Sequence, residues 1–287
     1  MIKTLCLIGV GMIGGSLARS LRLSRWCQSI VGIDVSSKAI DEAIALGVID
    51  EGYTTIDQYR HIPDVVVIAV PVMKVHVIFE QIKHWMDQCD AITDVCSTKQ
   101  SIINDYKNVF PDKGASCFVP GHPIAGRERS GIAAALDDLY QNRRVILTPM
   151  ENTRQQSLQL ISEMWQQAGA HVELLSAEKH DRILAATSHL PHALAFSLVH
   201  CLSTQSHTDE IFRYAAGGFA DFTRIASSDP TVWREICLAN SHELLEALAH
   251  FDTSLQKLRD CLAAGDGDAL QTIFSEAKDA RDRYTDS

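Results

Sequence analysis

The sequence lacks three features, and each absence excludes a class of protein. Its eight cysteines are scattered without a Cys-x-x-Cys pair, which argues against a disulfide framework and is typical of free thiols in a reducing cytosol. No apolar run is long enough to span a membrane. Met1 leads directly into an apolar run, so no secretory signal peptide is expected. We therefore expect a cytoplasmic protein.

Positive charge is also scarce. The 26 Lys and Arg residues face 36 Asp and Glu residues, which gives a formal net charge of −10. We expect no nucleic-acid or membrane partner, because both are polyanionic surfaces that repel an acidic protein. An anionic substrate would need arginines placed locally to hold it. The 287 residues, 46% of them hydrophobic, are enough for about two globular domains.

What the sequence does contain is a glycine-rich turn between an apolar run and a helical pattern. TLCLIGVGMIGG at 4–15 carries Gly9, Gly11 and Gly14 in the spacing GxGxxG, and SLARSLRL follows. A second apolar run ends on Asp34, 20 positions after Gly14 (34 − 14). This order of strand, glycines, helix, strand and acid is the dinucleotide-binding fingerprint, in which phosphates bind the N-terminus of the helix.

Asp34 favours NAD over NADP, because a carboxylate accepts hydrogen bonds from the ribose hydroxyls and repels a 2′-phosphate. The alternative is a structural strand–helix–strand turn that holds no ligand. The residues expected at the cofactor are those of the loop, the first helical turn, the acid and the end of the third apolar run: Gly9, Gly11, Met12, Ile13, Gly14, Asp34, Val70 and Pro71.

The chain changes character near residue 176. Before it, short apolar runs alternate with amphipathic stretches, which predicts an α/β fold with a mostly parallel sheet covered by helices on both faces. The predicted strands are 4–10, 30–35, 65–70, 91–95, 116–120, 145–148 and 171–175, and the helical stretches include 37–46, 72–85 and 153–168. We therefore assign residues 1–176 to a Rossmann-type dinucleotide-binding domain and 177–287 to a second, all-helical domain.

The second domain is dominated by one long helical stripe. Apolar residues recur at helical spacing over 229–264, and a further helix is predicted over 268–284. A helix of that length rarely buries its face alone, so we expect the second domain to form a homodimer. The alternative is a bundle within one chain.

Two segments at predicted strand ends carry polar groups suited to chemistry. DVCSTK at 94–99 lies at the rim of the cofactor crevice, where Ser97 could orient a substrate group or a histidine and Lys99 could approach the substrate or support the loop. The alternative for Ser97 is a helix N-cap. His122, in PGHPIAG, is held between turn-forming residues and is suited to be a general base, because its ordinary pKa is near neutral. The alternative is a surface-loop histidine.

Two segments of the second domain are candidates for substrate binding. SHLPH at 188–192 places His189 and His192 on one helical face, but no third ligand or adjacent acid accompanies them, so we expect pocket lining and no metal. One of the two could instead be a buried, hydrogen-bonded histidine. Arg224, in DFTRIASSDP, could hold a carboxylate bidentately, and the alternative is an ion pair with Asp221. Asp229 and the proline after it predict a helix start.

Five motifs in this order resemble the prephenate dehydrogenase family, which includes arogenate and cyclohexadienyl dehydrogenases. They are the glycine loop at 9–15, DVCSTK at 94–99, GHPIAG at 121–126, SHLPH at 188–192 and DFTRIASSDPTVW at 221–233, and together they span nearly the whole chain. The resemblance implies NAD-dependent oxidative decarboxylation of prephenate to 4-hydroxyphenylpyruvate, in tyrosine biosynthesis.

The resemblance also implies roles for matching residues. His122 would hydrogen-bond the ring C4 hydroxyl and assist proton removal as hydride leaves C4, with Ser97 in support. Arg224 would bind a substrate carboxylate, and His192 would line the pocket with His189 close by. Three positions depart from the family pattern or lie where it varies: Cys96 stands where glycine is frequent, and Arg127 and Arg129 could read a second carboxylate.

Other functions are weighed against this one. A beta-hydroxyacid dehydrogenase would carry a lysine on the helix over 179–202, where this chain has no lysine facing its histidines. A non-catalytic NAD sensor would have no need of His122, Ser97 and Arg224 together. Within the family, arogenate or dual specificity is the alternative to prephenate, and the two arginines after the GHPIAG motif favour the keto acid.

Overall fold

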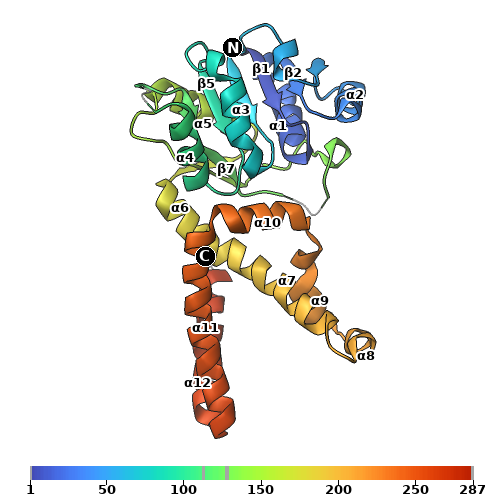
Figure 1. Ribbon diagram of the computed structural model, residues 1–287, viewed down its shortest axis with the longest axis vertical. Coiled ribbons are helices and arrows are strands. Elements are labelled where there is room, and N and C mark those ends of the chain that lie inside the picture. Colours follow the sequence, from blue (N-terminus) through green and yellow to red (C-terminus); the bar gives the residue numbers. More distant parts are fainter. Residues whose placement is uncertain (1, 112–113, 127–128, 286–287) are drawn as a thin grey trace. The chain divides into compact units, whose positions relative to one another are not determined.

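The computed structural model describes residues 2–111, 114–126 and 129–285 (Figure 1). The chain divides into two compact units, Met1–Ser241 and His242–Ser287. None of the eight cysteines takes part in a disulfide within the described residues. Across the same residues, no helix combines the length and the apolar character needed to cross a membrane.

Six parallel strands form the main sheet of the first unit, in the order β3-β2-β1-β4-β5-β6. β4 and β5 are buried at every position, as expected for parallel strands covered on both faces. The order reverses direction between β1 and β4, where such sheets bind ligands at the strands' carboxyl ends. The strands are β1 (Ile2–Ile8), β2 (Cys27–Ile33), β3 (Glu51–Tyr53), β4 (Val65–Ile68), β5 (Ala91–Asp94) and β6 (Phe118–Val119).

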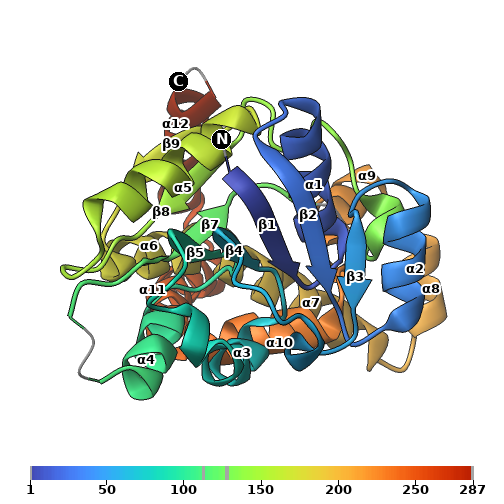
Figure 2. The ribbon, with the colours of Figure 1, turned by 90° about the horizontal axis from the view of Figure 1, so that it is seen from above.

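Alternation along the central strands builds a core on each face of this sheet. Leu5 and Leu7 of β1 pack in one cluster with residues of α1 (Met12–Leu23), α2 (Ser37–Ala45) and α5 (Gln155–Gln167). Cys6 and Ile8 pack in the other cluster with α3 (Val75–Gln81) and α4 (Gln100–Val109). Figure 2 shows these helices on opposite sides of the strands. The predicted α/β architecture, with helices on both faces, is confirmed.

The last predicted strands do not join this sheet. β7 (Gly121–Pro123) pairs antiparallel with β8 (Arg144–Leu147), and β9 (His171–Leu174) pairs parallel with β8 in a separate three-stranded sheet. The prediction of a single sheet is therefore wrong for β8 and β9, and both β3 and β7 were missed. Pro120 separates β6 from β7, and a proline cannot donate to a strand ladder.

Helices follow β9 through the rest of the first unit. α6 (Ala177–Leu184) continues through a single π-helical turn, Ala185–His189, into α7 (Leu190–Ser203). The π turn precedes Pro191, which lies in the first turn of α7 and has no N–H to give. The remaining elements are α8 (Thr208–Arg213), α9 (Gly217–Thr223), the 3-10 helix Arg224–Ser227 and α10 (Pro230–Ala239).

The long helix predicted over 229–264 is wrong, because it breaks at Asn240. α10 ends at Ala239, and α11 (Ser241–Ala264) begins two residues later. Asn240 leaves helical geometry, with φ −117° and ψ 33°, and its buried amide donates to the backbone oxygen of Asp181. Apolar periodicity continues through the break, so the pattern could not reveal it. The predicted start at Asp229 is confirmed, since its Oδ1 accepts from the N–H of Thr231 at 2.7 Å.

The second unit consists of most of α11 and of α12 (Gly267–Thr285). Gly265, with φ +66°, ends the first of these helices in the left-handed conformation that glycine favours. The predicted final helix over 268–284 is confirmed to within a residue at each end.

Candidate active site

The glycine loop has the geometry that its sequence predicts. Gly9 has φ +96°, and a Cβ there would lie 2.3 Å from the backbone oxygen of Ala69. A Cβ on Gly14 would lie 2.7 Å from the backbone oxygen of Gly9, so the third glycine lets α1 pack closely on the turn. A Cβ on Gly11 would meet no described atom within 4 Å. The loop therefore closes tightly on the sheet and leaves open space where a phosphate would approach.

The start of α1 and the end of β2 complete a dinucleotide cradle. α1 begins at Met12, and no described side chain caps it at Gly11, so its first N–H groups lack partners within the helix and carry the positive end of its dipole. Asp34 Oδ2 accepts from the Val10 N–H at 2.9 Å, and its Oδ1 accepts from the Ser36 N–H at 2.9 Å. The carboxylate is thus held beside the loop, with lone pairs left for ribose hydroxyls. These residues fit a dinucleotide.

The other predicted cofactor residues lie around the same strand ends. Met12 is buried and Ile13 is half-buried in the first turn of α1. Val70 is half-buried and Pro71 exposed, directly after β4 and next to the backbone that Gly9 approaches. The structure therefore gathers all eight predicted cofactor residues at the carboxyl ends of β1, β2 and β4.

Lys99 lies beneath the site and is completely buried. Its ammonium pairs with the carboxylate of Asp94, at the end of β5, and donates to the backbone oxygen of Gly121 at 2.5 Å. Asp94 in turn accepts from the N–H of Gly121 at 3.1 Å. The ion pair therefore ties the end of β5 to the strand that carries His122. Of the two roles open to Lys99, this geometry favours support of the loop over contact with a substrate.

Ser97 is half-buried on the same loop, and the described structure contains no hydrogen bond between its hydroxyl and His122. The helix-cap alternative does not apply to it, because α4 begins at Gln100 with Lys99 in the cap position. The neighbouring Cys96 is buried, and its Sγ lies 3.7 Å from the backbone oxygen of Val70. Among the described residues, no hydrogen-bond partner is therefore defined for Ser97.

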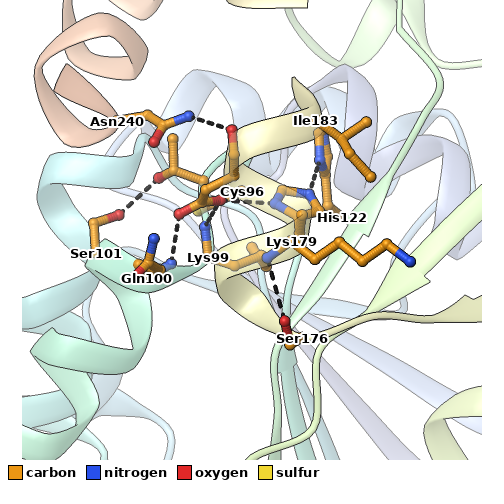
Figure 3. A network of polar contacts seen from close by, with 12 residues as sticks. Cys96, Lys99, Gln100, Ser101, His122, Ser176, Lys179, Ile183 and Asn240 are labelled. Atoms are coloured by element: carbon orange, nitrogen blue, oxygen red, sulfur yellow. Dashed lines mark hydrogen bonds and ion pairs between the residues drawn. The ribbon is translucent and has the colours of Figure 1, made fainter. Parts of the chain in front are cut away.

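His122 is buried and lies at one end of a chain of polar contacts (Figure 3). It lies in β7, and its Nδ1 is 2.8 Å from Nε2 of His180 in α6. His180 Nδ1 is 2.7 Å from Oδ1 of Asp181. His180 and Asp181 have no exposed surface. His122 is therefore an oriented, buried histidine, and its alternative as a surface-loop residue is wrong.

Asp181 also caps α4. Its two carboxylate oxygens accept from the N–H groups of Lys99 and Gln100, each at 2.8 Å. One carboxylate thus joins the His122 chain to the helix that follows the DVCSTK loop. Sequence reasoning missed both His180 and Asp181, because they look like part of a charged helical surface. The signal was the helical spacing that places them between Ala177 and Leu184 on the buried face of α6.

Burial keeps these histidines neutral near pH 7. It lowers the pKa of His122 well below its ordinary value, and the ammonium of Lys99 acts in the same direction, as His180 or His189 would if either were protonated. The pKa of His180 is also lowered by burial, against the opposing effect of its hydrogen bond to Asp181. A neutral His122 has a lone pair available to accept a proton, which is what a general base needs.

His189 extends the polar network toward α10. Asn240 Nδ2 lies 3.1 Å from Nδ1 of His189, which is 1% exposed and has its pKa lowered to about 4 by burial. Its Nε2 has no hydrogen-bond partner among the described atoms. Sequence reasoning missed Asn240. The one signal for it in the sequence is that a polar residue interrupts the apolar stripe over 229–264.

His192 and Arg224 are brought together at the other end of this region. The ring of His192 stacks on Trp233 with centroids 3.5 Å apart, and its Nδ1 is hydrogen-bonded to the Ser188 backbone oxygen at 2.9 Å. Burial lowers the pKa of His192, and the charge of Arg224 contributes to that shift. Arg224 is exposed at the start of its 3-10 helix. A half-buried histidine beside an exposed guanidinium is suited to receive a carboxylate.

One predicted residue, Arg129, does not join these groups. Arg129 is exposed, and no contact to the other candidates is described for it. Arg127 lies outside the described residues. The described residues also contain no group of three or more His, Cys, Asp or Glu side chains that could hold a metal ion.

Comparisons with known proteins agree with this geometry. The family model described as "Prephenate dehydrogenase, nucleotide-binding domain" matches residues 17–174, and "Prephenate dehydrogenase, dimerization domain" matches residues 176–276. The prephenate dehydrogenase of Bacillus subtilis (strain 168) is 37% identical over 98% of this chain and 76% of its own length. The cyclohexadienyl dehydrogenase of Zymomonas mobilis is 36% identical over 97% of this chain and 95% of its own.

A solved structure shows the same similarity in three dimensions. The crystal structure of prephenate dehydrogenase from A. aeolicus, in complex with hydroxyphenyl propionate and NAD+, has a TM-score of 0.93 and 37% identity, and the match covers 99% of each chain. Both family models lie in order along the chain, and the fold and the sequence agree from one end to the other. The chain therefore belongs to the prephenate dehydrogenase family.

Proposed function

We propose that this chain is an NAD-dependent prephenate dehydrogenase, which converts prephenate to 4-hydroxyphenylpyruvate, CO2 and NADH. The observation that carries the proposal is the state of His122. This histidine is buried and neutral, a hydrogen bond to His180 orients its ring, and it follows β6 of the dinucleotide-binding sheet. Membership of the family supports it. The function belongs to tyrosine biosynthesis.

NAD fits the cradle at the carboxyl ends of β1, β2 and β4. The open side of Gly11, the N-terminus of α1 and the carboxylate of Asp34 match a pyrophosphate and an unphosphorylated ribose. A relative with 37% identity was solved with NAD+ bound, which supports the same cofactor here. When bound, NAD supplies the acceptor for the hydride that leaves ring C4 of the substrate.

The chain's own residues transfer one proton of the substrate and bind its two carboxylates. His122 takes the proton of the C4 hydroxyl at Nε2 as the hydride leaves, so that C4 becomes a carbonyl carbon. The bond between ring C1 and its carboxylate then breaks, CO2 leaves, and the electron pair makes the ring aromatic. His122 returns the proton to the resulting phenolate oxygen, so no net proton is consumed. Aromatisation makes the overall reaction effectively irreversible.

We assign substrate binding to residues on two sides of the base. Arg224 binds a substrate carboxylate, with His192 and His189 lining the pocket, and Ser97 assists at the C4 hydroxyl. Two observations support these assignments. Arg224 is near enough to His192 to lower its pKa, and Nε2 of His189 has no hydrogen-bond partner among the described atoms. Lys99 acts as a positioning residue, because its ammonium is buried against Asp94. Arg127 and Arg129 remain candidates for a second carboxylate.

We also propose a cytoplasmic homodimer, in which residues 1–176 bind the cofactor and 177–287 form the helical dimerisation domain. The family model for dimerization begins at residue 176, close to that boundary, and supports the assignment. Within the second unit, large apolar side chains stay exposed on a single chain, as expected for a surface that a partner covers. They include Leu245, Leu255, Leu262 and Phe274.

The test is NADH formation by the purified protein with prephenate or arogenate, each with NAD and with NADP. Turnover with prephenate and NAD is expected. Turnover with arogenate alone would be consistent with the mechanism but would show that prephenate is not the substrate. The similarity to a cyclohexadienyl dehydrogenase makes arogenate a specific alternative. Absence of turnover with both would return a beta-hydroxyacid dehydrogenase or a non-catalytic NAD sensor to consideration.

A further inference from the structure

The contacts behind His122 form a directional chain. His122 Nδ1 faces His180 Nε2 at 2.8 Å, and His180 Nδ1 faces Asp181 Oδ1 at 2.7 Å. A neutral imidazole has one donor and one acceptor nitrogen, and an ionised carboxylate only accepts. The carboxylate therefore decides which nitrogen of each ring carries a proton.

The protons can be placed from the carboxylate outward. Asp181 also receives the N–H groups of Lys99 and Gln100, so three donors converge on its two oxygens and stabilise the ionised form. His180 must then donate from Nδ1, which leaves its Nε2 as an acceptor. His122 must donate from Nδ1 to that acceptor, which leaves the lone pair on its own Nε2.

The opposite arrangement requires a charged His180. A doubly protonated His180 would donate to His122 Nδ1 and would turn the Nε2 of His122 into a donor, unable to take a proton. Burial and the Lys99 ammonium both lower the pKa of His180 and so oppose that state. The charged or titratable groups that face His122 are His180 on α6, Lys99 before α4 and His189 in the π turn.

We propose that His180 and Asp181 are positioning residues that hold His122 as its Nδ1–H tautomer and stabilise the imidazolium formed when Nε2 takes the substrate's hydroxyl proton. The inference rests on the proposed function. The O–H bond of the substrate breaks, the N–H bond of His122 forms, and both changes reverse when the phenolate is protonated. Asp181 keeps its negative charge throughout and balances the transient positive charge through His180.

Asp181 gives this arrangement a second consequence. Its carboxylate caps α4, whose preceding loop carries Ser97, and its backbone oxygen accepts from Asn240. The orientation of the base and the position of the cofactor-side loop are thus fixed by one residue of the helical region. A change at Asp181 is expected to affect both, whereas a change at His180 isolates the base.

The first test reads protonation directly, in protein without ligands. Long-range 1H–15N NMR spectra of the histidine rings are recorded near neutral pH, and the His122 signals are those missing from His122→Asn. We expect neutral Nδ1–H rings for both His122 and His180. An Nε2–H tautomer at His122, or a doubly protonated His180, would overturn the proposal. This outcome is independent of turnover, so it remains readable even if the proposed substrate is wrong.

The second test compares two replacements of His180. His180→Leu removes the acceptor for His122, and we expect kcat to fall on the order of 100-fold with the KM for prephenate little changed. His180→Gln can place an amide oxygen near the former Nε2 and keep the tautomer, so it is expected to retain more activity. Equal losses in the two variants, or a change in KM alone, would contradict a positioning role.

The pH profile separates this role from a merely structural one. Without His180 the imidazolium of His122 loses support, so the acid limb of kcat/KM in His180→Gln is expected to move to lower pH. An unmoved limb would overturn the proposed charge stabilisation. Asp181→Asn is expected to lower kcat as well, with Glu178→Gln as the matched control, because Glu178 is exposed on the same helix. Thermal unfolding of every variant identifies any loss that comes from misfolding.

Discussion

Replacing Lys99 by methionine tests whether this lysine supports the site or contacts the substrate. Both side chains of the Lys99–Asp94 pair have no exposed surface. Lys99→Met keeps most of the buried hydrocarbon and removes the charge, which leaves the carboxylate of Asp94 buried without its cation. The loss therefore appears as a lower free energy of unfolding.

The structure sets the size of this effect. Removing one partner of a buried ion pair costs about 3–5 kcal/mol. Asp94 retains hydrogen bonds from the N–H groups of Cys96, at 2.9 Å, and Gly121, at 3.1 Å. These contacts partly compensate, so we expect about 3 kcal/mol, or a fall in Tm of roughly 10 °C for a unit of this size.

The assay is urea unfolding of wild type, Lys99→Met, Asp94→Asn and the double variant. The double variant should lose less than the two single changes together, since the second change removes the charge left unpaired by the first. Added salt should not change the coupling, because the pair is shielded from solvent. Lys107→Met is the matched control, because Lys107 is exposed on α4, and its effect should stay within about 0.5 kcal/mol.

One result would refute the reasoning. If Lys99→Met unfolds at the wild-type urea concentration and instead raises the KM for prephenate at least about 10-fold, Lys99 is a substrate contact. Its ammonium would then have to leave Asp94 and Gly121 when the substrate binds.

The remaining predictions concern the base, the carboxylate clamp and acid stability. His122→Asn should lower kcat by about 100-fold or more while NAD affinity, measured by calorimetry, stays unchanged; wild-type turnover would remove His122 from its role. Arg224→Ala should raise the KM for prephenate by about 10- to 100-fold, because the guanidinium binds the carboxylate equally in the ground state and in the transition state. A fall in kcat with an unchanged KM would contradict the assignment. His189 binds a proton in the unfolded chain below about pH 6.5 but in the folded protein only near its lowered pKa of about 4. Folding stability should therefore fall by about 3 kcal/mol from this group as the pH drops through that window, and His189→Gln should show a shallower fall in urea unfolding; equal slopes would count against it.

Local sequence was informative wherever the chain's own spacing determines geometry. The three glycines predicted the turn because each position has a steric reason, such as the 2.3 Å approach of a Cβ on Gly9 to Ala69. Short buried strands predicted a parallel sheet, and Asp229 predicted the start of α10. The sequence also singled out His122 between glycine and proline residues, although its partners lie far along the chain.

Periodicity failed where two interpretations share one pattern. The apolar stripe over 229–264 continues through Asn240, so it did not show that the backbone breaks there to bond Asp181. β8 and β9 have the composition of strands in the main sheet, and nothing local states which neighbour they pair with. Strand pairing depends on segments that are distant in sequence. Here β8 pairs with β7, the short strand that directly follows Pro120.

By itself, the sequence determined the dinucleotide fold, the glycine loop and the identity of the groups capable of chemistry. The tertiary structure decided how those groups are held. His180 is 58 positions beyond His122 (180 − 122), and only folding brings it, with Asp181 behind it, within hydrogen-bond distance of His122. Likewise, Lys99 becomes a support because Asp94 and Gly121 surround it in the folded chain. The physical reason is that burial, protonation and tautomer depend on long-range neighbours, whereas turns and helix ends depend on residues close in sequence.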